Sequence, residues 1–332
     1  MTLPIPFDFA PMEARVAAEL PSGGGYQFEP KWDGFRALCF RDGDRVELQS
    51  KSGQPLARYF PEIVAFAREL RPARFVLDGE LVVPVDDRLD FDQLLQRIHP
   101  AASRVAKLSK EFPSTYLVFD LLVDADGEAV YRLPLARRRP LLEAFARKNF
   151  GDESCFRLSP MTGDLETARE WYATVGGALD GIVAKRTDVP YDSGERRAML
   201  KIKRMRTADC VVGGFRPSKD GTSIGALLLG LYDHSGGFDY VGFTSGLSAA
   251  EKRTLLPQLE RLRGESAFTL RSPGGPSRWS REREREWVPL KPQLVVEVEY
   301  DHVSNGRFRH GTRPLRFRPD KAPKQCTTQQ LQ

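Results

Sequence analysis

The chain has 332 residues, 50 of them lysine or arginine and 45 aspartate or glutamate, which gives a net charge of +5 at pH 7. The length predicts about two domains, and 41% apolar residues are enough for two hydrophobic cores, which excludes a disordered chain. No run of 18 apolar residues is present and the first ten residues do not have the pattern of a secretory signal, so we expect no membrane partner.

The first two thirds of the chain show a mixture of strand and helix patterns. Apolar residues spaced i, i+3, i+4 and i+7 predict helices, and short β-branched and aromatic runs bounded by turn residues predict strands. In the predicted helix at 133–149, the basic side with Arg137, Arg138 and Arg139 is expected to face water. The predicted strands lie within 26–50 and at 75–83, 116–123, 181–186 and 199–204, and the predicted helices at 58–70, 133–149 and 165–175.

The pattern changes from Asp209 onward, where short apolar segments follow one another with glycine-rich turns between them. One helix interrupts them: Ser248 and Glu251 form a capping-box signature, and Pro257 is expected to end or kink that helix. A further strand is predicted at 293–301. Several short strands with one helix favour a small β-barrel, of which the OB-fold is the common nucleic-acid-binding form.

Charge and cysteine content support two parts with different tasks. Residues 1–205 carry 30 basic and 31 acidic side chains, and residues 206–332 carry 20 and 14. A near-neutral part followed by a basic part is typical of a catalytic core with an anion-binding appendage. The four cysteines are scattered, which predicts free thiols in a reducing cytoplasm rather than disulfides or a zinc site.

The first stretch that carries chemistry runs from Glu29 to Arg36 and reads EPKWDGFR. Lys31 stands between two strands with a carboxylate two residues away on either side. A lysine becomes a nucleophile once its amine is neutral, and both burial and nearby positive charge lower the pKa of a lysine. An exposed strand end with alternating charges is the simpler interpretation. KxDG alone occurs by chance in about one chain in ten of this length, and the longer string far less often.

Six further strings follow this stretch in chain order. They are SKSG (50–53), LDGEL (77–81), VFDL (118–121), DGIVAK (180–185), LKIK (200–203) and RPDK (318–321). The complete series resembles motifs I, Ia, III, IIIa, IV, V and VI of the covalent nucleotidyltransferases, specifically the ATP-dependent DNA ligases, and its layout looks like the stand-alone bacterial ligase C type. The resemblance implies an α+β nucleotidyltransferase domain with antiparallel sheets over residues 1–205, followed by an all-β OB-fold domain over residues 206–332.

The resemblance implies a role for each matching residue. Lys31 matches the nucleophile that attacks the α-phosphate of ATP and becomes lysyl-AMP. Glu29 matches the acceptor for the adenine amino group, and Phe119 the ring that stacks on adenine, although Phe119 alone reads equally well as a core residue. The other ATP- or AMP-binding matches are Arg36 and Lys51 for ribose and phosphate, Glu80 for ribose, Lys201 and Lys203 for the α-phosphate, and Arg318 and Lys321 for pyrophosphate, while Glu80 and Asp180 match metal ligands.

Three positions depart from the family pattern. Asp180 stands where motif IV usually has glutamate, Lys51 where motif Ia often has arginine, and Met199 where motif V often has tryptophan. The shorter carboxylate of Asp180 still permits a contact to Mg²⁺ through water, because Mg²⁺ keeps several of its waters in proteins. A lysine at position 51 loses the two-pronged contact that a guanidinium makes with phosphate.

The C-terminal segment 306–321 holds six lysines and arginines against one acid, Asp320. A solvated basic tail is the general interpretation. With the match to motif VI, Arg318 and Lys321 are expected to orient the leaving pyrophosphate, and the other arginines are expected to contact phosphates of the DNA backbone. Segment 281–286, in which arginine and glutamate alternate, is expected to be a solvated surface.

The resemblance implies an enzyme that seals nicks in duplex DNA through lysyl-AMP and a DNA-adenylate, with ATP as co-substrate and Mg²⁺, or alternatively Mn²⁺, as the metal. It further implies a monomer in the bacterial cytoplasm, at the nucleoid when bound to DNA, that acts in DNA repair. The alternatives are an RNA ligase or a GTP-dependent RNA-capping guanylyltransferase, which share KxDG, and a DNA-end-binding module without catalysis. The residues of motifs III, V and VI favour a DNA ligase over the other two enzymes. The intact Lys31 argues against the end-binding module.

Overall fold

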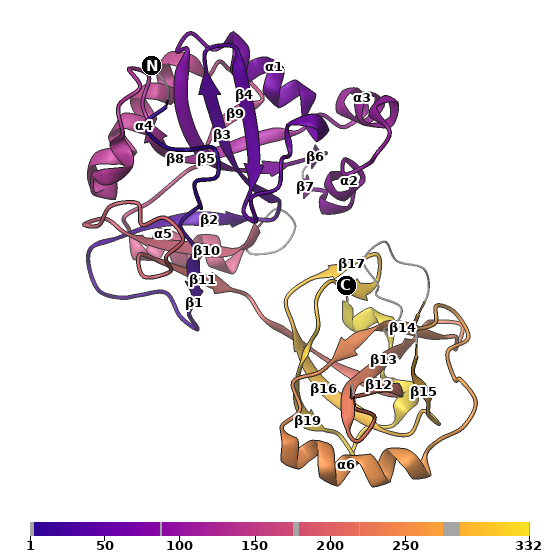
Figure 1. The fold of residues 1–332 in the computed structure, drawn as a ribbon. Coiled ribbons are helices and arrows are strands. Elements are labelled where there is room, and N and C mark those ends of the chain that lie inside the picture. Colours follow the sequence, from indigo (N-terminus) through magenta and orange to yellow (C-terminus); the bar gives the residue numbers. More distant parts are fainter. Residues whose placement is uncertain (1–2, 87, 175–178, 219, 275–285, 332) are drawn as a thin grey trace. The chain divides into compact units, whose positions relative to one another are not determined.

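The computed structural model describes residues 3–86, 88–174, 179–218, 220–274 and 286–331 (Figure 1). The chain forms two compact units, Met1–Arg204 and Met205–Gln332. Most of the alternating segment 281–286 lies outside the described residues. No helix in the described part of the chain is long and apolar enough to cross a membrane.

The first unit is built around two main sheets, in which most neighbouring strands are antiparallel. In the larger sheet β8 (Thr115–Val123) and β9 (Phe156–Leu158) pair in parallel, as do β1 (Ala14–Val16) and β11 (Met199–Lys203) in the smaller. The larger sheet has the order β4 (Arg45–Ser50), β3 (Phe35–Asp42), β5 (Arg74–Val82), β8 (Thr115–Val123) and β9 (Phe156–Leu158). The smaller has the order β1 (Ala14–Val16), β11 (Met199–Lys203), β10 (Leu179–Arg186) and β2 (Tyr26–Trp32), and β6 (Pro84–Val85) pairs with β7 (Arg88–Leu89).

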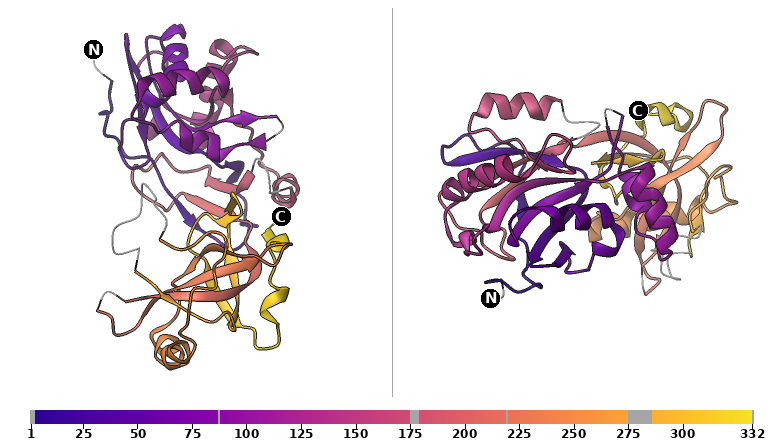
Figure 2. Two further views of the ribbon diagram at one scale, coloured as in Figure 1. Left: turned by 90° about the vertical axis from the view of Figure 1, so that its right-hand side faces the viewer. Right: turned by 90° about the horizontal axis from the view of Figure 1, so that it is seen from above.

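Helices cover the outer faces of these two sheets (Figure 2). Residues of α1 and α4 share a core with the larger sheet, and Ala168 of α5 shares a core with the smaller one. The short α2 and α3, which follow a hairpin, are not among the predicted helices. The helices are α1 (Pro61–Glu69), α2 (Phe91–Gln96), α3 (Ala102–Glu111), α4 (Leu135–Asn149) and α5 (Leu165–Ala173), with 3₁₀ turns η1 (Ala57–Tyr59) and η2 (Val130–Arg132).

The strands of the larger sheet are buried on both faces. Ala37 and Cys39 of β3 face the core beneath α1, and Leu38 and Phe40 face a second core that also contains Met199 of the smaller sheet. Side chains alternate between the two faces of a strand, so a strand buried on both faces reads as a continuous apolar run. The second core joins the two sheets along part of their length, and polar residues gather where it ends.

The expectation that the basic side of α4 with Arg137, Arg138 and Arg139 faces water is wrong for two of these three arginines. Arg138 and Arg139 are buried, and only Arg137 is exposed. Arg138 forms a two-pronged ion pair with the buried Asp120 of β8, at 2.9 and 3.0 Å, and Arg139 donates to Glu143 and to the carbonyl of Ser159. The pattern along the helix does not reveal Asp120 or the Ser159 carbonyl as acceptors, because both lie outside the helix.

The second unit is mainly β, which agrees with the predicted fold class, as does the α+β first unit. Its main sheet has the order β14-β13-β12-β16-β19, with β15 on β12, and β17 pairs with β18. The core lies between this sheet and α6 (Ala249–Arg261). The strands are β12 (Arg206–Pro217), β13 (Ile224–Tyr232), β14 (Phe238–Thr244), β15 (Val288–Pro289), β16 (Val295–Tyr300), β17 (Val303–Ser304), β18 (Arg307–Phe308) and β19 (Arg313–Phe317), followed by 3₁₀ turns η4 (Pro323–Gln325) and η5 (Thr328–Leu331).

Both halves of the predicted capping box begin α6. The Ser248 hydroxyl accepts from the Glu251 N–H, and the Glu251 carboxylate accepts from the Ser248 N–H. The helix does not end at Pro257 but runs on to Arg261. Proline removes one backbone donor, and Leu255 and Leu259, which are buried on either side of it, keep the helix packed on the sheet.

Candidate active site

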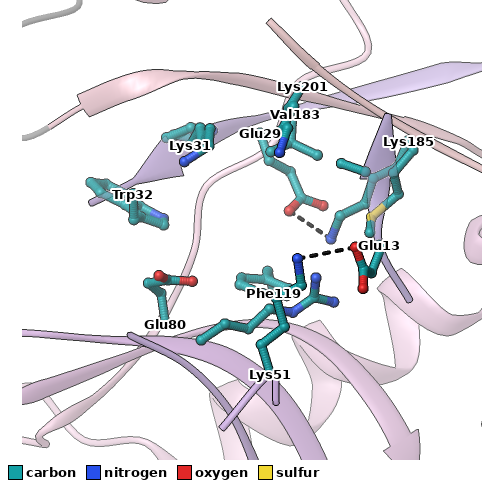
Figure 3. Close-up of a pocket in the computed structure, with 14 residues that line it drawn as sticks. Glu13, Glu29, Lys31, Trp32, Lys51, Glu80, Phe119, Val183, Lys185 and Lys201 are labelled. Carbon is teal, nitrogen blue, oxygen red and sulfur yellow. Dashed lines mark ion pairs between the residues drawn. The ribbon is translucent and has the colours of Figure 1, made fainter. Parts of the chain in front are cut away.

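A pocket opens between the two sheets of the first unit, and most of the sequence-predicted site residues line it (Figure 3). The smaller sheet supplies one wall and the larger sheet the other. The lining residues are Glu13, Ala14, Glu29, Pro30, Lys31, Trp32, Arg36, Lys51, Glu80, Phe119, Val183, Lys185, Met199 and Lys201.

The alternation of strands explains which residues of the smaller sheet reach the pocket. Positions two apart on a strand share a face. Register places Glu29 beside Val183, and Val183 beside Lys201. The set on this face is therefore Glu29 and Lys31 on β2, Val183 and Lys185 on β10, and Met199, Lys201 and Lys203 on β11.

A β-bulge brings Asp180 next to Lys31. The pairing of β10 with β2 shifts between Leu179 and Gly181, so Asp180 is an extra residue opposite the end of β2. Gly181 has φ +150°, and a Cβ there would lie 2.1 Å from the Ile202 carbonyl oxygen, so only glycine fits. The nearly buried carboxylate of Asp180 ion-pairs with Lys31, and Lys203 Nζ lies 3.3 Å from the same oxygen.

Cations therefore converge at this end of the pocket. Burial lowers the pKa of Lys201, and the positive charges of Lys203 and Lys31 lower it further. Two lysines share the single carboxylate of Asp180, while Lys201 lines the pocket beside them. Such an arrangement suits a ligand with several negative charges, such as a polyphosphate.

The larger sheet positions its pocket residues by register and by a second bulge. Arg36 on β3 pairs directly with Glu80 on β5, so the two share a face. The pairing of β5 with β8 shifts between Asp78 and Gly79, which makes Phe119 the extra residue and points its ring into the pocket (Figure 3). The Phe119 ring is partly buried and lies on the pocket wall.

Arg36 is held rigidly from behind. Its guanidinium donates to both oxygens of the buried Asp78, at 3.1 and 2.6 Å, and the hydroxyl of Tyr191 donates to Asp78 at 2.6 Å. A two-pronged pair of this kind fixes orientation as well as charge. Gly34 precedes β3, and a Cβ there would lie 2.2 Å from the Leu81 carbonyl oxygen, so glycine is required for β3 to pair closely with β5.

Glu80 has both basic and acidic side chains near it. Burial raises its pKa to about 7, although Lys31 and Arg36 act in the opposite direction. At neutral pH the carboxyl is therefore divided between its charged and neutral forms. A cation bound beside Glu80 would favour the charged form.

At the other end of the pocket, a buried ion pair flanks the Phe119 ring. Glu29 Oε2 lies 2.8 Å from Lys185 Nζ, and Gln27 donates to Glu29 Oε1 at 2.7 Å. Lys185 Nζ stands 4.4 Å from the centre of the Phe119 ring. Lys185 and Glu29 are close enough for an ion pair, but the orientation of the ammonium does not make a hydrogen bond with the carboxylate. The flat Phe119 ring suits stacking on the face of a purine base. The acceptor of Glu29 and the donor of Lys185 suit the polar edge of that base.

Lys51 enters the pocket from the turn after β4. Its Nζ lies 3.0 Å from Glu13 Oε2, and Arg196 lies 2.9 Å from the same oxygen. The Lys51 hydrogen bond outweighs burial and lowers the pKa of Glu13. The carboxylate thus gathers two further cations at the rim of the pocket.

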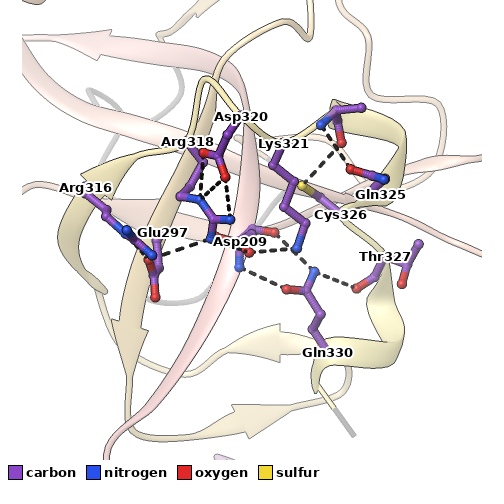
Figure 4. A network of polar contacts seen from close by, with 11 residues as sticks. Asp209, Glu297, Arg316, Arg318, Asp320, Lys321, Gln325, Cys326, Thr327 and Gln330 are labelled. Carbon is purple, nitrogen blue, oxygen red and sulfur yellow. Dashed lines mark hydrogen bonds and ion pairs between the residues drawn. The ribbon is translucent and has the colours of Figure 1, made fainter.

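The two remaining predicted residues, Arg318 and Lys321, belong to the second unit (Figure 4). Both contact Asp209 of β12, and Arg318 also contacts Asp320 and Glu297. Of the other arginines in the basic segment, Arg313 pairs with Glu299 and Arg316 with Glu297. The fold therefore surrounds this segment with acids from distant parts of the chain.

Sequence reasoning did not single out all of the residues that shape the pocket. Lys185 and Asp78 lie inside the strings DGIVAK and LDGEL, so their motifs contained them, and their partners Glu29 and Arg36 were named. Glu13, Tyr191 and Arg196 lie outside every string, and nothing in the spacing points to them. Their roles follow only from the contacts described above.

The described residues contain no group of three or more acidic, histidine or cysteine side chains that would hold a metal by themselves. Glu80 lines the pocket, and Asp180 lies at its cationic end. Mg²⁺ commonly binds one or two carboxylates and takes its other oxygens from substrate phosphates and water. This pair of carboxylates therefore fits a metal that enters together with a polyphosphate.

Two family models match the chain. The model described as ATP dependent DNA ligase domain matches residues 11–203, and the one described as ATP dependent DNA ligase C terminal region matches residues 220–321. The first lies within the first unit and the second within the second unit.

Three curated relatives extend this match. DNA ligase C2 of Mycolicibacterium smegmatis is 43% identical over 347 residues, and DNA ligase C of Mycobacterium tuberculosis is 41% identical over 348 residues. Each alignment covers 100% of this chain and 96% of the relative. The multifunctional non-homologous end joining DNA repair protein LigD of M. tuberculosis is 33% identical over 306 residues, covering 90% of this chain and 37% of LigD.

These matches confirm the predicted resemblance. They agree with a fold in which an α+β unit carries the pocket and a mainly β unit follows. The chain belongs to the family of ATP-dependent DNA ligases, and it is similar over its full length to bacterial DNA ligases C, the stand-alone type.

Proposed function

We propose that this ATP-dependent DNA ligase seals nicks in duplex DNA through a lysyl-AMP formed on Lys31 and then a DNA-adenylate. The observation that carries the proposal is the environment of Lys31, whose amine reaches Asp180 in a pocket also lined by Lys201, Glu80 and Arg36. A primary amine can attack a phosphate when a carboxylate accepts its proton and nearby cations stabilise the charge on the phosphate.

ATP would occupy the pocket with its base at the Phe119 end and its phosphates at the Lys31 end. Glu29 supplies an acceptor for the adenine amino group, and Lys185 supplies a donor for the ring nitrogen beside it. Arg36, held by Asp78, and Glu80 then lie beside the ribose and the α-phosphate. Lys201 and Lys203 offset the charge that develops on the α-phosphate.

In the first step, Lys31 must lose a proton before it can attack. The Asp180 carboxylate, which ion-pairs with the Lys31 ammonium, is placed to receive that proton. A bond forms between Lys31 Nζ and the α-phosphorus, and the bond from that phosphorus to the bridging oxygen breaks. Pyrophosphate leaves with the electron pair, and Arg318 and Lys321 bind it.

In the second step, an oxygen of the 5′-phosphate at the nick attacks the same phosphorus, and the Lys31 amine leaves. In the third step the 3′-hydroxyl attacks the 5′-phosphorus, a phosphodiester bond forms and AMP leaves. Both steps depend on positioning of the reacting groups and on stabilisation of the charge that develops on the phosphate. Mg²⁺ or Mn²⁺, held by Glu80 and Asp180 with the phosphates, would supply charge neutralisation.

We further propose that the protein works as a monomer in the cytoplasm, at the nucleoid when bound to DNA, and in DNA repair. The full-length similarity to DNA ligase C and the similarity to LigD, which is named a DNA repair protein, support this setting. The excess positive charge of the second unit supports a contact with the DNA backbone.

The function is tested by incubating the protein with α-³²P-labelled ATP, GTP or NAD and Mg²⁺, followed by a denaturing gel and a sealing assay on nicked duplex DNA. We expect label from ATP and sealed DNA. Label from GTP alone would indicate the capping reaction, and label from ATP with sealing of a nicked RNA substrate but not of the nicked DNA would indicate an RNA ligase. Absence of label with every nucleotide would refute the enzyme assignment and favour an end-binding module.

Replacing Glu29 with glutamine is expected to weaken the choice of ATP over GTP. Guanine presents a carbonyl oxygen where adenine has its amino group, and a carboxylate repels that oxygen while an amide does not. We expect the ratio of kcat/KM for lysyl-AMP formation from ATP to kcat/KM for lysyl-GMP formation from GTP to fall by about tenfold. Glu13→Gln changes another pocket carboxylate and should leave the ratio unchanged. An unchanged ATP-to-GTP ratio in Glu29→Gln would contradict the proposed contact between Glu29 and adenine.

The Glu80 carboxyl is expected to titrate near pH 7 in the nucleotide-free protein, as measured by ¹³C NMR, with Glu80→Gln used to assign the signal. Lys31→Met removes a cation and should raise this pKa further, because Lys31 lowers it. The folded pKa lies above the ordinary value of 4.5, so the contribution of Glu80 to stability falls as pH rises through this interval, and Glu80→Gln removes that slope. Titration near pH 4.5 would contradict the burial of the group.

A further inference from the structure

In the second unit, one carboxylate contacts both predicted pyrophosphate-binding cations (Figure 4). Asp209 Oδ2 accepts from Lys321 Nζ at 2.7 Å, and its two oxygens lie 3.2 and 3.3 Å from Arg318 Nη1. Arg318 and Lys321 lie in the turn after β19, while Asp209 lies near the start of β12, more than a hundred positions earlier in the chain. No sequence string includes Asp209.

Asp209 is the least exposed of the three acids that contact Arg318. Its side chain is 12% exposed, whereas that of Asp320 is 63% exposed and lies largely in water. Asp320 contacts Arg318, and Glu297 lies 3.9 Å from Arg318. Asp320 makes a shorter, two-pronged contact with Arg318, at 2.8 and 3.0 Å, but water screens the attraction of an exposed acid, whereas the less exposed Asp209 contacts both cations.

The backbone of Asp209 is itself braced by the C-terminal segment. Its N–H donates to Gln330 Oε1 at 3.0 Å, and its carbonyl accepts from Gln330 Nε2 at 3.2 Å. Gln330 Nε2 also donates to the carbonyl of Thr327, and the neighbouring Leu331 is buried in the core. A carboxylate on a central strand, fixed on both sides of its backbone, is a rigid base for two flexible cationic side chains.

Two cations close together repel each other and, without a shared anion, would turn apart into water. Arg318 and Lys321 are only 21% and 23% exposed, so their charged groups stay together on the surface of the unit. Both are needed in one orientation only while pyrophosphate leaves. The later sealing step releases AMP and involves no pyrophosphate.

We propose that Asp209 is a positioning residue that holds Arg318 and Lys321 together for lysine adenylation. This proposal rests on the proposed function and deepens it. Asp209 touches no substrate: it acts through the two cations, and its loss slows the step that releases pyrophosphate while sparing the step that joins the DNA ends.

The test measures two steps separately in the full-length protein. Asp209→Asn keeps the size of the side chain and removes its charge. We expect the rate of lysyl-AMP formation at saturating ATP to fall about 10- to 100-fold, since small errors of placement cost rates of that order. Sealing of a nick that already carries the 5′-adenylate should stay within about twofold, and Asp209→Glu should restore part of the adenylation rate.

Asp239→Asn is the matched control. Asp239 is 10% exposed, lies on β14 of the same unit and pairs with Arg271, so its loss disturbs a similar ion pair far from these cations in the sequence. It should leave both steps within about twofold. Equal slowing of both steps by Asp209→Asn would show a structural role only, and faster adenylation would show that Asp209 withholds the cations; either result overturns the proposal. A wild-type protein that forms no lysyl-AMP would instead refute the proposed function.

Discussion

Lys31→Arg is expected to abolish lysyl-AMP formation, with a loss of at least about 10³-fold in the labelled adduct. Arginine keeps the positive charge and can still pair with Asp180, but a guanidinium does not lose its proton in a protein. The variant therefore separates nucleophilicity from charge. The measurement is the amount of ³²P-labelled protein on a denaturing gel after incubation with α-³²P-labelled ATP and Mg²⁺.

The same variant should still seal a nick that carries the 5′-adenylate, with a loss of less than about tenfold, because the third step uses no amine nucleophile and the cation is retained. Lys203→Arg is the control for the other lysine that contacts Asp180, and it should still take up label. Label at wild-type levels in Lys31→Arg would place the nucleophile on another lysine. Equal loss of both steps would indicate that position 31 is needed for the shape of the pocket.

Much of the pocket was predictable because it is built from strands. Glu29 and Lys31, or Lys201 and Lys203, are two positions apart, and a strand places such residues on one face without help from distant parts of the chain. The ordered strings therefore contain most of the lining residues. The strands predicted at 75–83, 116–123 and 181–186 and the start of the helix after Ser248 also follow from local patterns, which the structure confirms.

The rest depends on contacts between distant residues. The bulges at Asp180 and Phe119 are register shifts between two strands, and a single strand does not reveal the register of its partner. In the same way, the basic C-terminal segment contains one acid in the sequence, yet Asp209 and Glu297 reach it in the fold. A charge pattern within one segment predicts exposure only when no buried partner lies elsewhere.

Arg138 shows this limit most clearly and leads to a large expected effect on stability. The Arg138 and Asp120 side chains are 1% and 2% exposed, and the guanidinium bonds both carboxylate oxygens. Arg138→Met leaves the Asp120 carboxylate buried without this partner, which costs about 3–5 kcal/mol. For a unit of this size we expect the melting temperature to fall by about 10 °C, measured by differential scanning calorimetry.

The adjacent Arg137 provides the control, because it is exposed on the same helix and Arg137→Met should change the free energy of unfolding by less than about 0.5 kcal/mol. Asp120→Asn combined with Arg138→Met should be less destabilised than the sum of the single variants, since the uncompensated charge is then absent. An unchanged melting temperature in Arg138→Met would mean that the pair contributes nothing to stability.

The pH dependence gives a second, independent test of the same pair. Burial alone would raise the pKa of Asp120, but the charge and hydrogen bonds of Arg138 outweigh it and hold the pKa below its ordinary value. The folded state therefore binds fewer protons than the unfolded state, and the stabilisation is present above about pH 4 and is lost as the pH falls through the lowered pKa. In Arg138→Met the buried carboxyl protonates more readily, so the difference in stability between variant and wild type should narrow in acid. A difference that stays constant from pH 7 to about pH 3 would show that the penalty comes from lost packing of the arginine stem and not from the buried charge of Asp120.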